Sequence, residues 1–140
     1  MTSDEDLMAK AVAALPLAYC RYSKFPVAAA LLCKDGTVFT GVNVENASYG
    51  GTICAERSAY VAAVSQGKRE FLTIAIATEL EAPAAPCGIC RQFMNEFGNI
   101  KVILGSSKNC KTLVTTIKEL LPHSFGPTDL SNHATELAYN

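Results

Sequence analysis

PVAAALLCKDGTVFTGVNV, residues 26–44, is the stretch that decides the fold. Its first half, Pro26 to Cys33, is a continuous run of small apolar residues, which is typical of a strand buried on both faces. The sequence KDGT that follows is a hairpin turn signal, and VFTGVNV returns as a second strand paired with the first. The sequence therefore predicts a β-hairpin whose first strand is deeply buried.

Helix-like and strand-like segments alternate along the rest of the chain. Residues 3–19 have the apolar spacing of a helix, with Ser3 as its N-cap. Two more helices are predicted over residues 54–66 and 87–97, each followed by a glycine that stops it. The remaining predicted elements are strands at residues 71–78, 101–105 and 112–116 and a short helical segment at 117–122. About five strands with helices between them predict an α/β fold, a three-layer α/β/α sandwich whose mixed sheet carries helices on both faces.

Length and composition describe one domain of ordinary size. Of the 140 residues, 49% are hydrophobic and 18% are charged, which is enough for a packed core. We expect a single domain over residues 1–140, in which residues 128–140 form a flexible C-terminal tail. The formal net charge of −1 argues against a broad polyanion-binding surface, so nucleic acid is not expected as the main partner.

The N-terminal sequence MTSDEDLMAK is acidic, whereas a secretory signal begins with positive charge. The apolar stretch over residues 11–20 is short and is broken by Pro16. No window approaches the roughly 20 apolar residues that a membrane-spanning helix needs. A soluble, cytoplasmic protein with no membrane partner is the expectation.

Six cysteines stand at positions 20, 33, 54, 87, 90 and 110. In a reducing compartment, clustered cysteines indicate metal or redox chemistry more often than disulfides. PCGIC places Cys87 and Cys90 behind Pro86 on the first turn of a predicted helix, where the helix dipole and free N–H groups stabilise thiolates. Taken alone, this motif fits both a zinc half-site and a thioredoxin-like redox pair.

Cys54 starts the other predicted helix, after a strand and a Gly-Gly loop. If the two helices pack side by side, three thiolates converge, and three thiolates suit Zn²⁺. No further Cys or His has ligand spacing, and three protein ligands plus water is the catalytic pattern. Glu56 would then lie beside the metal as a proton carrier. Arg57 would offset the thiolate charge through hydrogen bonds, and Gln92 would add a further donor.

The segments SKFPVAAALL, FTGVNVENASYGGTICAERSA, PCGICRQF and ELLPHSFGP resemble the cytidine deaminases of the small, homotetrameric, three-cysteine type. The similarity covers residues 7–130, and CAE followed by PCxxC is a specific signature of zinc deaminases. It implies one Zn²⁺ per chain, held by Cys54, Cys87 and Cys90, with Glu56 as the catalytic residue. The implied activity is hydrolytic deamination of cytidine and deoxycytidine to uridine and deoxyuridine plus ammonia, as in pyrimidine salvage.

The resemblance also implies a substrate site. Asn43 and Glu45 resemble the family's ribose-binding pair, which suits sugar hydroxyls because these both donate and accept hydrogen bonds. Phe25 resembles the aromatic residue that packs on the pyrimidine ring. The backbone of Ala55 resembles a contact to the polar edge of that ring.

Two residues are expected at subunit boundaries. The resemblance implies a homotetramer in which Phe125 reaches the active site of a neighbouring subunit. Tyr49 is expected near a subunit boundary, also in contact with the substrate site. The active sites would accordingly lie near the subunit interfaces.

Two other hypotheses stay open. One is a related deaminase with a different substrate, such as an aminonucleoside antibiotic or a cytosine in RNA or single-stranded DNA. The small size and near-neutral charge speak against a polynucleotide. The other is a non-catalytic structural zinc or redox module, which would hold either a fourth protein ligand or no zinc.

Overall fold

A mixed five-stranded sheet forms the centre of the protein, in the strand order β2-β1-β3-β4-β5. The computed structural model describes residues 2–139, so the expected domain's first and last residues lie outside the described part. Strand β1 pairs antiparallel with β2 and β3, β3 pairs parallel with β4, and β4 pairs antiparallel with β5. The strands are β1 (Val27–Cys33), β2 (Val38–Val42), β3 (Phe71–Thr78), β4 (Lys101–Ser106) and β5 (Thr112–Thr116).

The predicted hairpin is confirmed, and its first strand lies in the interior of the sheet. From Ala28 to Cys33 every residue of β1 is buried, because β1 has a strand on each side and helices over both faces. Small side chains suit this position, since packed layers approach the strand from above and below. Strand β3 is buried in the same way over Thr73–Thr78, as its apolar run predicts.

Helix α1 (Asp4–Ala14) covers one face of the sheet, where Leu7 and Ala11 pack against β1 and β3. Ser3 is its N-cap, as predicted, and the serine Oγ accepts a hydrogen bond of 3.1 Å from Asp6 N. The helix ends earlier than the predicted residue 19 and continues as a 3₁₀ turn over Leu15–Leu17. The shortening follows from Pro16, which lacks an N–H and disrupts an α-helix interior.

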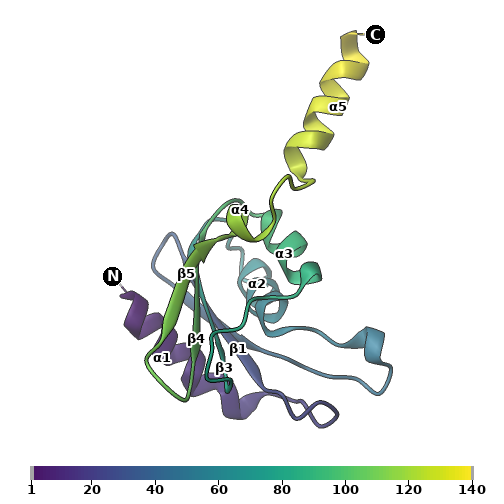
Figure 1. The fold of residues 1–140 in the computed structure, drawn as a ribbon. Helices are drawn as coiled ribbons and strands as arrows, with labels where there is room; N and C mark the ends of the chain where they lie inside the picture. Colours follow the sequence, from purple (N-terminus) through teal and green to yellow (C-terminus); the bar gives the residue numbers. More distant parts are fainter. Residues whose placement is uncertain (1, 140) are drawn as a thin grey trace.

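Helices α2 (Ala55–Ser65) and α3 (Gly88–Asn95) cover the opposite face, so the three-layer arrangement is confirmed (Figure 1). The short helix α4 (Ile117–Leu120) follows β5 on this side. The glycines predicted to stop α2 and α3 have the positive φ of such stops, 83° at Gly67 and 101° at Gly98.

Strand β2 and helix α2 approach each other closely at Gly41. A Cβ atom on Gly41 would lie 2.3 Å from Ala59 N and 2.6 Å from Ala55 O. Only glycine therefore fits this position while α2 keeps its place. The contact fixes the N-terminal end of α2 against the sheet, and that end carries Cys54 and Glu56.

A fifth helix, α5 (Pro127–Tyr139), extends away from the rest of the chain (Figure 1). Residues 128–140 were expected to form a flexible tail, and the sequence pattern did not predict this helix. None of its described residues is buried, so the tail makes no contribution to the core. Over residues 2–139, none of the helices has the length and apolar character that crossing a membrane requires.

Candidate active site

The three cysteines of the predicted zinc site lie at the N-terminal ends of α2 and α3. Cys54 is the N-cap of α2, Cys87 is the N-cap of α3, and Cys90 lies in the first turn of α3. Pro86 directly precedes the N-cap residue Cys87. The two helices pack against each other, which brings their N-terminal ends together. Both helix dipoles therefore favour negative charge on the sulfurs.

The sulfur positions fit a zinc ion. All three Sγ atoms lie within 4.8 Å of one another, and Cys54 Sγ is 3.8 Å from Cys87 Sγ. Tetrahedral zinc with Zn–S bonds of about 2.3 Å separates its sulfur ligands by about 3.8 Å. The cluster can therefore hold one zinc ion, with one coordination position left for a non-protein ligand.

The cluster also favours the thiolate form of Cys54. A hydrogen bond from the Cys90 thiol, together with the Arg57 guanidinium, lowers the pKa of Cys54 to about 5. The pKa of the Cys90 thiol is raised, since that thiol is the donor to Cys54 and is itself buried. A cation that replaces the shared proton can bind all three sulfurs as thiolates.

Glu56 is the second residue of α2 and is only 4% exposed. Burial raises the pKa of its carboxyl group, and the negative charge of Cys54 acts in the same direction. Because glutamates are rarely buried without a partner, this side chain is a candidate for chemistry.

Arg57 lies against the sulfur of Cys54. Its Nη2 donates to Cys54 Sγ at 3.5 Å and lies at the same distance from the carbonyl oxygen of Thr52. The Cys54 contact raises the pKa of the guanidinium, which stays charged. Its Nε is buried and has no hydrogen-bond partner within residues 2–139. A cation in this place offsets the charge of a three-thiolate site.

A cavity of about 490 Å³ opens beside the sulfurs and Glu56. Four of the six predicted substrate residues line it: Phe25, Asn43, Glu45 and Ala55. Its floor is completed by the ends of β1 and β3, through Val27, Ile76 and Thr78. Cys54 and Cys87 line the same cavity, so two of the predicted zinc ligands lie beside the residues predicted to contact the pyrimidine and the ribose.

Tyr49 and Phe125 do not line this cavity within the chain. Tyr49 is 76% exposed and borders a neighbouring hollow with Tyr22, and Phe125 is 60% exposed. Gln92, expected to donate to a thiolate, instead donates through Nε2 to the Phe125 carbonyl oxygen at 2.9 Å. Because Gln92 is exposed and points to this segment, its amide supports the chain near Phe125 rather than the sulfurs.

Asn43 and Glu45 also hold the loop that carries Phe25. Asn43 Nδ2 donates to Phe25 O at 2.8 Å, and Asn43 Oδ1 accepts from Val27 N at 3.0 Å. Glu45 Oε1 accepts from Tyr22 N and Ser23 N, both at 3.0 Å. The pair expected to bind the ribose therefore shapes the cavity wall as well.

Two residues of the site are absent from the set predicted from the sequence. Arg91 Nε donates to Pro86 O at 2.7 Å and its Nη1 to Leu120 O at 2.9 Å, which ties the cysteine-bearing loop to α4. Ser23 lines the cavity and donates to Glu45. The position of Arg91 directly after Cys90 was a usable signal, whereas nothing in the local pattern singled out Ser23.

An α/β/α sandwich with three clustered thiols, a buried carboxylate beside them and an adjoining cavity is the arrangement of zinc-dependent deaminases. The sequence profile described as "Cytidine and deoxycytidylate deaminase zinc-binding region" matches residues 1–106. The chain belongs to the cytidine and deoxycytidylate deaminase family.

Similar proteins agree with this membership. A cytidine deaminase of Sporosarcina psychrophila is 46% identical over 134 residues, which is 94% of this chain and 98% of that protein. The crystal structure of cytidine deaminase from Burkholderia pseudomallei is 46% identical, with a TM-score of 0.85 over 88% of this chain and 99% of the other. That from Mycobacterium tuberculosis is 37% identical, with a TM-score of 0.76 over 89% and 98%.

Proposed function

We propose that this protein is a zinc-dependent cytidine deaminase, which hydrolyses cytidine and deoxycytidine to uridine and deoxyuridine plus ammonia. The observation that carries the proposal is the meeting of Cys54, Cys87 and Cys90 at two helix N-termini, beside buried Glu56. Family membership supports it, as do the relatives named cytidine deaminase. Such an activity belongs to pyrimidine salvage.

Each residue of the site has a part in this reaction. Zinc, when bound by the three thiolates, supplies a water acidic enough to attack the pyrimidine C4 at neutral pH. Glu56 takes a proton from the attacking water and delivers it to ring N3, then takes the remaining proton from the new C4 hydroxyl and passes it to the amino group. The C4–O bond forms, the C4–N bond breaks and ammonia leaves. Arg57 keeps its charge against Cys54 throughout.

The rest of the cavity binds the nucleoside. Phe25 packs on the pyrimidine ring, and the backbone of Ala55 contacts its polar edge, since both line the cavity beside Glu56. Asn43 and Glu45 receive the sugar hydroxyls. Walls close to the ring exclude bulk water, which strengthens the interactions of the buried carboxylate.

The charge of the cavity favours a nucleoside over the nucleotide that the family description also covers. Its charged lining residues are Glu45 and Glu56, and no lysine or arginine lines it within residues 2–139. Both phosphate and Glu45 are anionic, so Glu45 would repel a substrate phosphate near the sugar site, and the cavity lining offers no lysine or arginine within residues 2–139 to offset that repulsion.

Assembly and location are part of the same proposal. Exposed Phe125 and Tyr49 are available to a neighbouring subunit in a homotetramer, which would place the active sites near the interfaces. A cytoplasmic location follows from the need to keep three thiols reduced for zinc. Light scattering at micromolar concentration tests the tetramer, and a fully active monomer would contradict it.

A deamination assay with and without a zinc chelator tests the activity. Zinc-loaded protein should lower the absorbance of cytidine as uridine forms and release one ammonia per uridine. Removal of zinc should abolish turnover, and re-addition should restore it. Folded, zinc-loaded protein that releases no ammonia from cytidine or deoxycytidine would refute the proposal. Turnover of deoxycytidylate above that of deoxycytidine would overturn the nucleoside preference.

A further inference from the structure

We propose that Ser23 is a positioning residue for substrate recognition, whose hydroxyl aims the free carboxylate oxygen of Glu45 at the sugar of the nucleoside. The inference rests on the proposed function, because it takes Glu45 as the carboxylate that meets the sugar. Ser23, Glu45 and Phe25 all line the cavity beside the sulfurs.

The hydrogen bonds of Glu45 leave one acceptor position open. Oε1 accepts two backbone N–H groups, those of Tyr22 and Ser23, each at 3.0 Å, so both of its lone pairs are in use. Oε2 accepts from the hydroxyl of Ser23, which leaves it one lone pair. An ionised carboxylate only accepts, so this lone pair can receive one hydroxyl of the ligand.

The hydroxyl of Ser23 is itself oriented. Ser23 Oγ accepts from Phe25 N at 3.1 Å, while its single proton goes to Glu45. One side chain therefore links the carboxylate that meets the sugar to the backbone of the aromatic residue that meets the base. Within residues 2–139 no lysine or arginine forms an ion pair with Glu45, so Ser23 is the side chain that sets its direction.

Ser23→Ala should weaken binding of cytidine without slowing the chemistry. In this variant the backbone N–H groups would still bind Glu45 Oε1, but Glu45 Oε2 would lose the hydrogen bond from the hydroxyl. The carboxylate would then lose conformational freedom when the sugar binds, which weakens binding. We expect KM for cytidine to rise about tenfold. This is the lower end of the affinity loss expected when a hydrogen bond to a charged group is removed, because the Glu45 carboxylate is partly exposed. The kcat should stay within about twofold, and Ser23→Thr, which keeps the hydroxyl, should restore KM.

A substrate without the 2′ and 3′ hydroxyls separates positioning from general damage. 2′,3′-Dideoxycytidine offers no hydroxyl at C2′ or C3′, so the direction of Glu45 Oε2 should matter little for it. We expect Ser23→Ala to change KM for this analogue less than about twofold, while KM for cytidine rises about tenfold.

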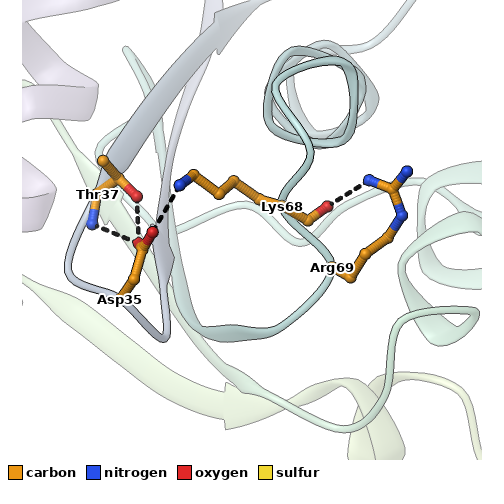
Figure 2. Close-up of polar contacts among 4 residues, drawn as sticks. All are labelled: Asp35, Thr37, Lys68 and Arg69. Atoms are coloured by element: carbon orange, nitrogen blue, oxygen red, sulfur yellow. Dashed lines mark hydrogen bonds and ion pairs between the residues drawn. The ribbon is translucent and has the colours of Figure 1, made fainter.

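The turn between β1 and β2 provides a matched control (Figure 2). There the Thr37 hydroxyl and its backbone N–H, the latter at 3.0 Å, both donate to the Asp35 carboxylate. This turn follows the last residue of β1, whereas the cavity is at its first residue, Val27. Thr37→Val removes the same kind of contact away from the substrate and should leave both KM values unchanged.

Three results would contradict the proposed role of Ser23. Unchanged KM in Ser23→Ala, an equal loss for cytidine and the dideoxy analogue, or no recovery in Ser23→Thr would overturn the role of Ser23. If Ser23→Ala does not fold, Ser23→Cys replaces it, because a thiol is a weaker donor of similar size. This variant should raise KM for cytidine by a smaller factor and leave KM for the dideoxy analogue unchanged. No rise in KM for cytidine would overturn the inference. Wild-type protein inactive on cytidine would instead refute the proposed function itself.

Discussion

Glu56 and Arg57 are adjacent in the chain but do different work, because they occupy different sides of the same helix turn. Glu56 faces the cavity and is buried, whereas Arg57 lies against the sulfurs through Cys54. We propose that Glu56 moves protons and that Arg57 offsets the charge of the thiolates. Two substitutions separate these roles.

Glu56→Gln should keep the fold and the zinc while losing most turnover. Glutamine has nearly the same shape but cannot accept and return a proton at neutral pH, and general acid–base groups contribute about 10²- to 10⁴-fold to rate. We expect kcat to fall by that range, with about one zinc per chain by metal analysis. Full activity in this variant would remove Glu56 from the mechanism.

Arg57→Gln should bind zinc but react more slowly. Without the guanidinium, the three thiolates leave the zinc too electron-rich to acidify water, and loss of such an outer partner costs about 10- to 100-fold in affinity or activity. Competition with a chromogenic chelator gives the zinc affinity, and the uridine assay gives kcat. If neither quantity changes, Arg57 has no part in the site.

At the level of elements, the position of α2 against β2 decides where the site forms. Gly41→Ala would place a methyl group 2.3 Å from Ala59 N, where backbone cannot give way. We expect the free energy of unfolding to fall by about 3 kcal/mol or more, with loss of zinc affinity as α2 shifts.

Gly105→Ala is the control for this prediction. Its new Cβ would meet the flexible end of Met8, with Met8 Cε at 2.6 Å. A flexible methionine tip can move aside, so we expect a loss of about 1 kcal/mol and normal zinc binding. Chemical denaturation and metal analysis on both variants test the difference, which equal losses would contradict.

The turn between β1 and β2 should make stability depend on acid pH. Lys68 and Thr37 hydrogen-bond to Asp35 and hold the pKa of its carboxyl below the ordinary 3.8 (Figure 2). A lowered folded-state pKa contributes stability that is fully present above about pH 4 and is lost as the pH falls further. The melting temperature of Asp35→Asn should therefore be lower than wild type at neutral pH, and the difference should shrink below about pH 4. A difference that stays constant from neutral pH down to about pH 2 would contradict this.

At the scale of the whole molecule, the proposed homotetramer would let Phe125 serve the site of a neighbouring subunit. Two side chains of α3 donate hydrogen bonds to the carbonyl oxygen of Phe125, Gln92 Nε2 at 2.9 Å and Asn95 Nδ2 at 3.2 Å. The side chain of Phe125 is nevertheless exposed and does not line the cavity of its own chain. An anchored backbone with an exposed aromatic ring suits insertion into a neighbouring subunit.

Mixed oligomers test this arrangement. Phe125→Ala and Glu56→Gln should each be poorly active alone. If Phe125 acts across subunits, co-expression of the two variants creates sites with Glu56 from one chain and Phe125 from the other, so activity should exceed that of both parents. Activity of the purified mixed oligomer equal to the parents' average would assign Phe125 to its own chain.

The sequence was sufficient for features that depend on residues close together in the chain. The apolar runs of β1 and β3, the Ser3 cap, the glycine stops at 67 and 98 and the cysteines at two helix starts all follow from local spacing. The family signature joins such local motifs, which is why the cysteine cluster, with Glu56 next to it in the chain, could be predicted from the sequence alone. Helix α5 was not predicted, and none of its residues is buried in the part of the chain that the structure describes, so it carries no buried apolar face that the sequence pattern could reveal.

Only the tertiary structure decided how these motifs meet. The 3.8 Å between Cys54 Sγ and Cys87 Sγ depends on two helices packing on one face of the sheet, a contact between residues 33 positions apart. The partners of Gln92 and Ser23 were likewise set by packing, since each binds a segment more than twenty residues away. Local patterns fix what each segment becomes, whereas strand register and helix packing fix which side chains share a site, because those contacts link positions that no local pattern relates.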